Sequence, residues 1–287
     1  MLTEGGLSGS LIARDLDTGY EIGINEDTPY PLASLVKLPL VGAVLDRFQN
    51  RDLDPAQPLF LDPADRTPGP SGLSLFRYPA TVALGDLPYL TMAVSDNTAA
   101  DALFALVAPS AVDRWVASLG VRGIRVRHSI RSLYQSIAER VEGADLAVLH
   151  RLVVAADSTG LPSPIPQLDP DAANAGTARA FADLLTRIWD SGEFDRVGAL
   201  RDLMGANMVR HRLAPDFSSD RTRWFSRTGS FLNLRHEVGV VEHTSGRRIA
   251  VCALTRSAVA ASDQPAAEAA IGRAARILHD HVLDSTP

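Results

Sequence analysis

Lysine is almost absent from this chain. Only one of its 28 lysine and arginine residues is a lysine, Lys37. An arginine side chain stays protonated in proteins, so it does not serve as a base. A lysine amine becomes a base where burial or a neighbouring cation lowers its pKa. Because the chain otherwise uses arginine for positive charge, the position of Lys37 indicates a need for an amine that can lose its proton.

Cysteine is equally scarce. Cys252 is the single cysteine, which excludes a disulfide within the chain. Its neighbours in the sequence are apolar, which is typical of a thiol in a core strand. The sequence has no cysteine and histidine cluster with the spacing of a zinc site. We therefore expect neither a metal nor another cofactor.

Long apolar runs and an excess of positive charge are also missing. No apolar run reaches the ~20 residues of a membrane-spanning helix. The formal net charge is −6 with both signs interspersed, which argues against nucleic acid as a partner. The first residues lack the basic and apolar regions of a secretory leader. We expect a monomer that acts on a small molecule without nucleic-acid or membrane partners. Its expected location is cytoplasmic, and the alternative is an exported form whose leader has been removed.

Ser34 and Lys37 form an S-x-x-K motif at the start of a helix predicted over residues 34–48. Residues three apart lie on one face of a helix, so the hydroxyl and the amine can meet there. A serine hydroxyl becomes a nucleophile when a nearby base accepts its proton. The pattern predicts Ser34 as a nucleophile and Lys37 as its base.

Strand patterns lie at both ends of the chain and helical patterns in the middle. Residues 8–28 have the pattern of a hairpin, three strands are expected within 224–255, and a helix is expected over 265–282. Residues 50–80, rich in proline, aspartate and glycine, are expected to be irregular. Between 121 and 171 the pattern predicts one helix, over 144–155.

This arrangement predicts an α+β protein with two interleaved domains. Residues 1–48 and 205–287 would form an antiparallel sheet flanked by helices. Residues 49–204 would form an inserted all-helical domain. The active site is expected between the two domains.

Two further short motifs follow S-x-x-K in the sequence, Ser95-Asp96-Asn97 and Arg227-Thr228-Gly229. At average residue usage, S-x-x-K arises about once by chance in a chain of this length, whereas S-D-N has a chance of only about a few per cent. Asp96 is interpreted as a structural residue that braces its own turn. The three motifs in this order are together specific evidence for a serine acyl-transfer site.

On these motifs the chain resembles the serine β-lactamases and penicillin-binding proteins, most closely the class A β-lactamases and their serine-hydrolase relatives. The resemblance implies a β-lactamase/transpeptidase-like fold and a role in antibiotic resistance. It implies that Ser34 forms an acyl-enzyme with a β-lactam or a related carboxylate-bearing amide or ester. Lys37 would accept the proton, and Ser95 would pass it to the leaving nitrogen.

The resemblance also implies binding roles. Asn97 would hold the amide side chain of the substrate, and the backbone N–H groups of Ser34 and Ser230 would form the oxyanion hole. Arg227 stands where the family usually has lysine, although some carbenicillin-hydrolysing members carry arginine. With Thr228 it would hold the substrate carboxylate.

Gly229 completes the strand motif as a further substrate-binding position, and Arg235 is one more candidate because it directly precedes a predicted strand. Tyr134 is interpreted as a packing residue.

The chain departs from class A β-lactamases where those enzymes have the glutamate that activates water for deacylation. Alignment on Leu133 places Ile130 there, and a shift of one residue places Arg131 there. Neither side chain takes a proton from water. Glu139 and Glu142 are the nearest acids downstream. We therefore expect slow release of the acyl group unless one of these two reaches the site.

Three other functions remain open at this point. The missing glutamate is compatible with a D-Ala-D-Ala-type peptidase or transferase. The missing leader is compatible with a cytoplasmic biosynthetic esterase or acyltransferase. A non-catalytic β-lactam- or peptide-binding module is the third, and the joint presence of Ser34, Lys37, Ser95 and Asn97 counts against it.

Overall fold

The computed structural model describes residues 1–140, 145–159, 161, 163–190 and 195–285. The strands are β1 (Leu7–Asp15), β2 (Glu21–Ile24), β3 (Tyr30–Pro31), β4 (Pro58–Leu61), β5 (Ala80–Ala83), β6 (Ile124–Arg125), β7 (Ala175–Gly176), β8 (Thr222–Phe231), β9 (Leu234–His243) and β10 (Arg248–Ser257). The α-helices are α1 (Lys37–Gln49), α2 (Leu87–Ala93), α3 (Asn97–Leu106), α4 (Pro109–Ser118), α5 (Ile130–Arg140), α6 (Leu146–Thr159), α7 (Ala178–Asp190), α8 (Asp195–Gly205), α9 (Ala214–Phe217) and α10 (Pro265–Ser285).

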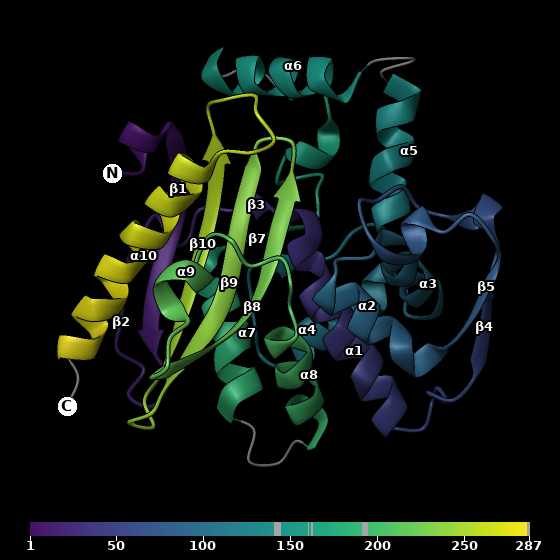
Figure 1. The fold of residues 1–287 in the computed structure, drawn as a ribbon, viewed down its shortest axis with the longest axis horizontal. Coiled ribbons are helices and arrows are strands. Elements are labelled where there is room, and N and C mark those ends of the chain that lie inside the picture. The colour runs from purple at the N-terminus through teal and green to yellow at the C-terminus, as the bar shows by residue number, and fades with distance from the viewer. Residues whose placement is uncertain (141–144, 160, 162, 191–194, 286–287) are drawn as a thin grey trace.

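A five-stranded sheet joins the two ends of the chain. Its order is β2-β1-β10-β9-β8, and every neighbouring pair is antiparallel. β1 pairs with β10 along its whole length, so the first strand lies beside the last (Figure 1). β8 is left as an edge strand. The sheet and its helices confirm the predicted α+β fold.

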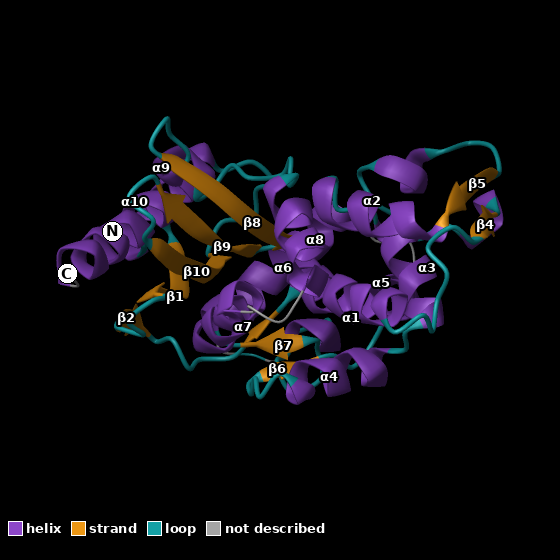
Figure 2. Ribbon diagram, turned by 90° about the horizontal axis from the view of Figure 1, so that it is seen from below, coloured by secondary structure: helices purple, strands orange, loops and turns teal. Residues whose placement is uncertain are grey.

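Helices cover both faces of this sheet (Figures 1 and 2). α10 packs against β1 and β10 on one face, and α7 packs against the same strands on the other. Successive side chains of a strand point to opposite faces. Leu11 of β1 therefore joins the core under α10, and Ile12 joins the core that continues into the helical part. Cys252 is fully buried in this sheet, as predicted, and burial raises the pKa of its thiol.

Helices α1, α2, α3 and α8 lie on the β8 side of the sheet (Figure 2), whereas α9 contacts α10. α1 contacts α2, α3, α4 and α8, and its apolar residues belong to the larger core. Its close contact with α4 needs a glycine. A Cβ at Gly42 would lie 2.2 Å from the indole of Trp115. The predicted division into domains at 48/49 and 204/205 stays a prediction.

Two stretches have more regular structure than the sequence predicted. Residues 50–80 are predicted to be irregular. The structure instead has β4 within this range, and β4 pairs with β5. Between 121 and 171 the structure has α5 in addition to α6. α6 corresponds to the helix predicted over 144–155, of which residue 144 lies outside the described residues. Among the described helices, none is long and apolar enough to cross a bilayer.

Candidate active site

Ser34 and Lys37 lie on the same side of a tight turn. The predicted single helix over 34–48 is instead a 3-10 helix, Ala33–Val36, followed by α1, which begins at Lys37. Side chains three apart eclipse each other in a 3-10 helix, so this change keeps the pair together. Ala33 enters the turn with φ 47°, in the left-handed region that non-glycine residues rarely adopt. Such strain concentrates at functional sites.

Gly229 allows β8 to reach this turn. A Cβ at Gly229 would lie 2.7 Å from the carbonyl oxygen of Leu32 and 2.9 Å from Cγ of Leu35. A larger residue would therefore push the edge strand away from the nucleophile. The glycine of R-T-G thus has a structural role, and it places Thr228 and Ser230 beside Ser34.

The amine of Lys37 is buried among uncharged acceptors. Nζ donates to the carbonyl oxygen of Ser95 and to Oδ1 of Asn97, both at 2.6 Å, and contacts Oγ of Ser95 at 3.1 Å. Burial, and then the charge of Arg227, lower the pKa of Lys37 well below its ordinary value. The more distant carboxylates of Asp96 and Asp101 oppose this shift, but they are weaker causes. This environment favours the neutral amine, which is the form that accepts a proton.

The hydroxyl of Ser95 connects this amine to the nucleophile. Its Oγ lies 3.3 Å from Oγ of Ser34 and 3.1 Å from Nζ of Lys37. Ser95 has φ 61°, and Asp96 stabilises the turn by accepting hydrogen bonds from the backbone N–H groups of Thr98 and Ala99 at the start of α3. The predicted structural role of Asp96 fits this geometry.

Arg227 acts on Ser95 from behind the site. It donates to Oγ of Ser95 at 2.6 Å, to the carbonyl oxygen of Ser34 at 3.2 Å and to that of Met92 at 3.0 Å. Burial lowers the pKa of Arg227 to about 9, which leaves it protonated at neutral pH. Its side chain is fully buried and does not line the cavity in front of Ser34. The structure therefore places its charge next to Ser95 and outside the lining of the cavity.

A cavity of about 320 Å³ opens in front of Ser34, and we call it the active-site cavity. It is lined by residues of the three motifs, of α5 and of neighbouring loops: Ala33, Ser34, Pro70, Ser71, Val94, Ser95, Asn97, Ile130, Leu133, Tyr134, Val209, Thr228, Ser230 and Phe231. The amide of Asn97 faces the cavity and is held on both sides. Its Oδ1 accepts from Lys37, and its Nδ2 donates to the carbonyl oxygen of Pro68 at 2.6 Å.

Arg235 is not brought into this cavity. Its guanidinium donates to the carbonyl oxygens of Leu234 at 2.9 Å and Ala261 at 2.7 Å, away from Ser34. The predicted contact of Arg235 with substrate is therefore not supported by its position. The pairing of β9 with β10 directs the side chain of Arg235 toward the loop before α10.

Arg212 takes a position that the sequence did not indicate. Its Nη2 donates to Oγ of Ser230 at 2.7 Å, and the guanidinium is held by Glu268 at 3.2 Å and by the carbonyl oxygen of His236 at 3.0 Å. This buried cation lies directly behind a hydroxyl of the cavity. No motif surrounds it, because it reaches Ser230 only through the fold.

α5 forms the wall opposite β8. Ile130 and Leu133 are buried against the cavity, and the ring of Tyr134 meets that of Phe231 edge to face, with 6.3 Å between ring centroids. The hydroxyl of Tyr134 lies 3.5 Å from Nδ2 of Asn97. Tyr134 thus belongs to the site as well as to its packing. Of the two residues that the alignments place at the glutamate position, Ile130 lines this cavity and Arg131 does not.

Of the two downstream acids that could replace that glutamate, the one that the structure describes does not line the cavity. Glu139 is exposed on the far part of α5, and Glu142 lies outside the described residues. Arg131, the other aligned residue, points away and donates to the backbone of Asp65.

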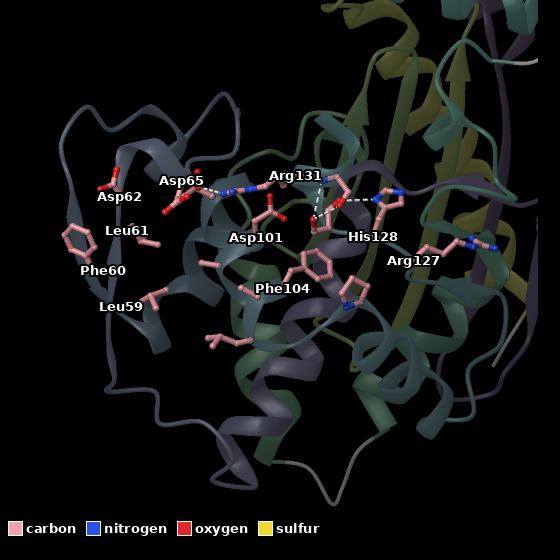
Figure 3. Close-up of a pocket in the computed structure, with 17 residues that line it drawn as sticks. Leu59, Phe60, Leu61, Asp62, Asp65, Asp101, Phe104, Arg127, His128 and Arg131 are labelled. Carbon is pink, nitrogen blue, oxygen red and sulfur yellow. Dashed lines mark hydrogen bonds between the residues drawn. The ribbon is translucent and has the colours of Figure 1, made fainter. Parts of the chain in front are cut away.

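A second, larger cavity of about 680 Å³ lies on the other side of α3 and α5 (Figure 3). Arg127, His128 and Arg131 line it, together with Asp101. Asp101 accepts from the backbone N–H of Ile130 at 2.8 Å, at the first residue of α5. This bond fixes the start of α5 and thereby the position of Ile130 in the active-site cavity.

The fold and the arrangement of these motifs define a protein of the β-lactamase and penicillin-binding-protein type. Residues 2–282 match the family described as the β-lactamase enzyme family, and the chain belongs to this family. A relative from Streptomyces cacaoi, named β-lactamase regulatory protein BlaB, is 50% identical over 297 residues, which cover 99% of this chain and 95% of that protein.

Solved structures show the same fold at low sequence identity. A β-lactamase from Chitinophaga pinensis has a TM-score of 0.78 at 17% identity, with 98% of this chain and 96% of that chain covered. A β-lactamase from Sphaerobacter thermophilus has a TM-score of 0.77 at 22% identity, covering 100% and 95%. A variant of PBP-A, solved as an acyl-enzyme complex with penicillin G, has a TM-score of 0.73 at 17% identity, covering 97% and 91%.

Proposed function

We propose that this protein forms an acyl-enzyme at Ser34 with a β-lactam or a related carboxylate-bearing amide or ester, and that it releases the acyl group slowly. The observation that carries the proposal is the chain of contacts from Oγ of Ser34 through Oγ of Ser95 to the buried amine of Lys37. The PBP-A variant, which shares the fold, is a precedent because its structure is an acyl-enzyme complex with penicillin G.

In the acylation step, Oγ of Ser34 attacks the carbonyl carbon of the substrate. Its proton passes to Oγ of Ser95, whose own proton passes to Nζ of Lys37. When the carbon–nitrogen bond of the substrate breaks, the same path returns one proton to the leaving nitrogen. The cation of Arg227 beside Ser95 stabilises negative charge on this path.

The backbone N–H groups of Ser34 and Ser230 remain the proposed oxyanion hole. Ser230 lies on the edge strand, where alternate backbone N–H groups face away from the sheet.

Deacylation needs a water molecule and a base, and the α5 residues that line the cavity include no carboxylate to act as that base. Among the described residues that line the active-site cavity there is no carboxylate. Ile130 and Leu133 present hydrocarbon where a general base would be required. The acyl-enzyme is therefore proposed to persist.

The name of the relative, a regulatory protein, supports a regulatory role for a persistent acyl-enzyme. A long-lived acyl-enzyme keeps the protein in a modified form that can signal the presence of a β-lactam. Rapid hydrolysis would return the protein to its unmodified form and end the signal. We propose that the protein acts in β-lactam-dependent regulation, and that any contribution to antibiotic resistance follows this route. The monomeric state and the cytoplasmic location stay predictions.

Mass spectrometry after exposure to penicillin G tests the proposal. We expect one covalent adduct on Ser34 and none in Ser34→Ala. Stopped-flow measurements with nitrocefin should then show a burst of about one equivalent followed by slow turnover. An adduct that persists in Ser34→Ala would refute the nucleophile. Sustained turnover without a burst, abolished by Glu139→Gln or Glu142→Gln, would refute slow release.

A further inference from the structure

The second cavity, of about 680 Å³, is separated from the active-site cavity by α5 (Figure 3). Ile130, Leu133 and Tyr134 of this helix line the active-site cavity, whereas Arg131 and Ser132 line the second cavity. The volume lies within the ~300–1,000 Å³ range of ligand pockets. The second cavity is therefore large enough to hold a ligand, and it is one helix away from the site of acylation.

One side of the second cavity is the free edge of β4. In the described part of the chain, β4 pairs only with β5. Leu59, Phe60 and Leu61 of β4 all line the cavity, and no described residue of β5 does. A cavity on one face of this two-stranded sheet would meet both strands and every second side chain, because successive side chains point to opposite faces. The cavity therefore runs along the edge of β4 that β5 leaves uncovered.

This edge offers a backbone donor and a backbone acceptor. The carbonyl oxygen of Gln57 accepts from the backbone N–H of Leu84 at 2.9 Å, so these two residues form a bonded pair. Bonded and non-bonded pairs alternate along an antiparallel ladder, which makes Leu59 and Leu61 the next bonded residues. The N–H and C=O of Phe60 are thus directed to the free edge. Such an edge is where an extended peptide adds as a further strand.

The opposite side of the second cavity allows a main chain to approach closely. It is one face of α3, formed by Thr98, Asp101, Ala102 and Ala105, which are three or four residues apart. Asp101 is occupied by hydrogen bonds from the hydroxyl of Thr67 and the backbone N–H of Ile130. The two alanines have short side chains. This side therefore supplies apolar contact without filling the space beside β4.

Negative charge marks the end of the free edge. Asp62 and Asp65 directly follow β4, line the second cavity and are exposed, and Figure 3 shows them at the β4 side. Arg131, across the cavity, donates to the backbone carbonyl oxygen of Asp65 and not to its carboxylate. A basic side chain is the complement of these two carboxylates.

We propose that the second cavity binds an extended peptide segment of a partner protein, which adds to β4 as a third strand and places a basic side chain beside Asp62 and Asp65. The free edge spans the four residues Pro58–Leu61 and is followed by Pro63, so about four residues of the partner pair with it. Few strand bonds and one charge contact predict a dissociation constant of about 0.1 to 1 mM.

The probe is the synthetic peptide acetyl-Arg-Val-Thr-Val-Thr-Val-Arg-amide. Its β-branched residues favour an extended chain, and an arginine at each end serves either strand direction. We expect calorimetry to show one site, and binding about tenfold weaker for the matched peptide with glutamate at both ends. Absence of binding would overturn the proposal, and equal affinities would overturn the role of Asp62 and Asp65. Binding to Ser34→Ala should be unchanged, so the result does not depend on the proposed function.

Two variants of one residue test strand addition. Phe60→Pro removes the N–H at the free edge, and proline is tolerated on an edge strand where its nitrogen lies outside the ladder. It should weaken binding of the arginine peptide at least tenfold. Phe60→Ala keeps that N–H and removes a side chain that is 63% exposed, so its affinity should stay within about threefold. Equal affinities of the two variants would contradict strand addition.

Two further measurements use the unaltered protein. The arginine peptide with N-methyl groups on its three central residues cannot donate along either edge, and it should bind at least tenfold more weakly. Unchanged affinity would contradict strand addition even where Phe60→Pro does not fold. Sedimentation equilibrium tests the other occupant of an open strand edge, a second copy of this chain. A dimer that the peptide dissociates would overturn the assignment to a partner protein.

Discussion

The wall of the active-site cavity formed by the nucleophile turn and β8 differs from the wall formed by α5. Hydrogen bonds on the first wall join Ser34, Lys37, Ser95 and Arg227. These bonds hold the side chains in position without a bound substrate. On the second wall, apolar side chains line the cavity, among them Ile130, which alignment on Leu133 predicts at the position of the family's glutamate. In the mechanism we propose, the first wall holds the groups that form the acyl-enzyme, and the second lacks those that would hydrolyse it.

Under the proposed mechanism, the two half-reactions of the serine acyl transfer depend on separate structural elements. The acylating groups are fixed by the strained turns at Ala33 and Ser95 and by an edge strand. The α5 wall is fixed at its start by backbone hydrogen bonds from Ile130 and Arg131 to Asp101, and along its length by apolar packing. A change in α5 can therefore remove hydrolysis while the nucleophile keeps its geometry.

The largest expected effect comes from the base of the first wall. Lys37→Arg keeps a positive charge but removes the amine that can be deprotonated. We expect the rate constant for acylation by penicillin G to fall by about two to four decades, the usual range for loss of a general base. Near-normal acylation by a folded Lys37→Arg protein would show that Lys37 acts only through its charge.

A smaller effect, in the opposite direction, is expected from the second wall. Ile130→Glu supplies a carboxylate at the missing position and should speed release of the penicilloyl group from Ser34 by about 10- to 100-fold. The gain stays in this lower range because the apolar surroundings raise the pKa of the new carboxyl group and reduce its basic form at neutral pH.

Ile130→Gln is the matched control, because it has the same length and polarity without a base. It should leave the lifetime of the acyl-enzyme, measured by mass spectrometry over time, close to that of the unaltered protein. A similar acceleration by Gln and by Glu would mean that entry of water limits release, and that the absence of a base does not.

The comparison of walls also explains which parts of the molecule could be predicted from the sequence. S-x-x-K and S-D-N are local patterns, so Ser34, Lys37 and Ser95 could be named as candidates without a structure, although the contacts among them join positions 58 and 61 residues apart. The strands of the sheet could be found because alternating and continuous apolar runs report burial directly. The 3-10 turn that replaces the start of the predicted helix shifted no functional residue.

The residues that the sequence did not reveal act across long distances in the chain. Arg212 meets Ser230 and Glu268 only after the sheet and α10 have formed. Tyr134 resembles a packing residue until α5 and β8 face each other. Arg235, by contrast, stands beside a predicted strand, yet its side chain binds loop carbonyl groups. Sequence position alone does not distinguish these arginines.

The smallest expected effect concerns how the first wall is attached to the sheet. The buried imidazole of His236 accepts at Nδ1 from the backbone N–H of Thr255 at 3.0 Å and donates from Nε2 to the carbonyl oxygen of Pro31 at 2.8 Å, three residues before Ser34. Burial lowers the pKa of His236 to about 3, so the ring is neutral in the folded protein. In the unfolded chain a histidine titrates near pH 6.5.

Between these two values the unfolded state binds a proton that the folded state does not, so the free energy of unfolding falls as the pH decreases from about 6.5 toward 3. We expect this group to remove about 1 kcal/mol between pH 7.5 and 5.5. His236→Gln cannot take up that proton. Although it is less stable at pH 7.5 through loss of the bond from Thr255, its free energy of unfolding in urea should decrease less over the same interval. Identical decreases in the two proteins would show that His236 does not couple attachment of the nucleophile turn to pH.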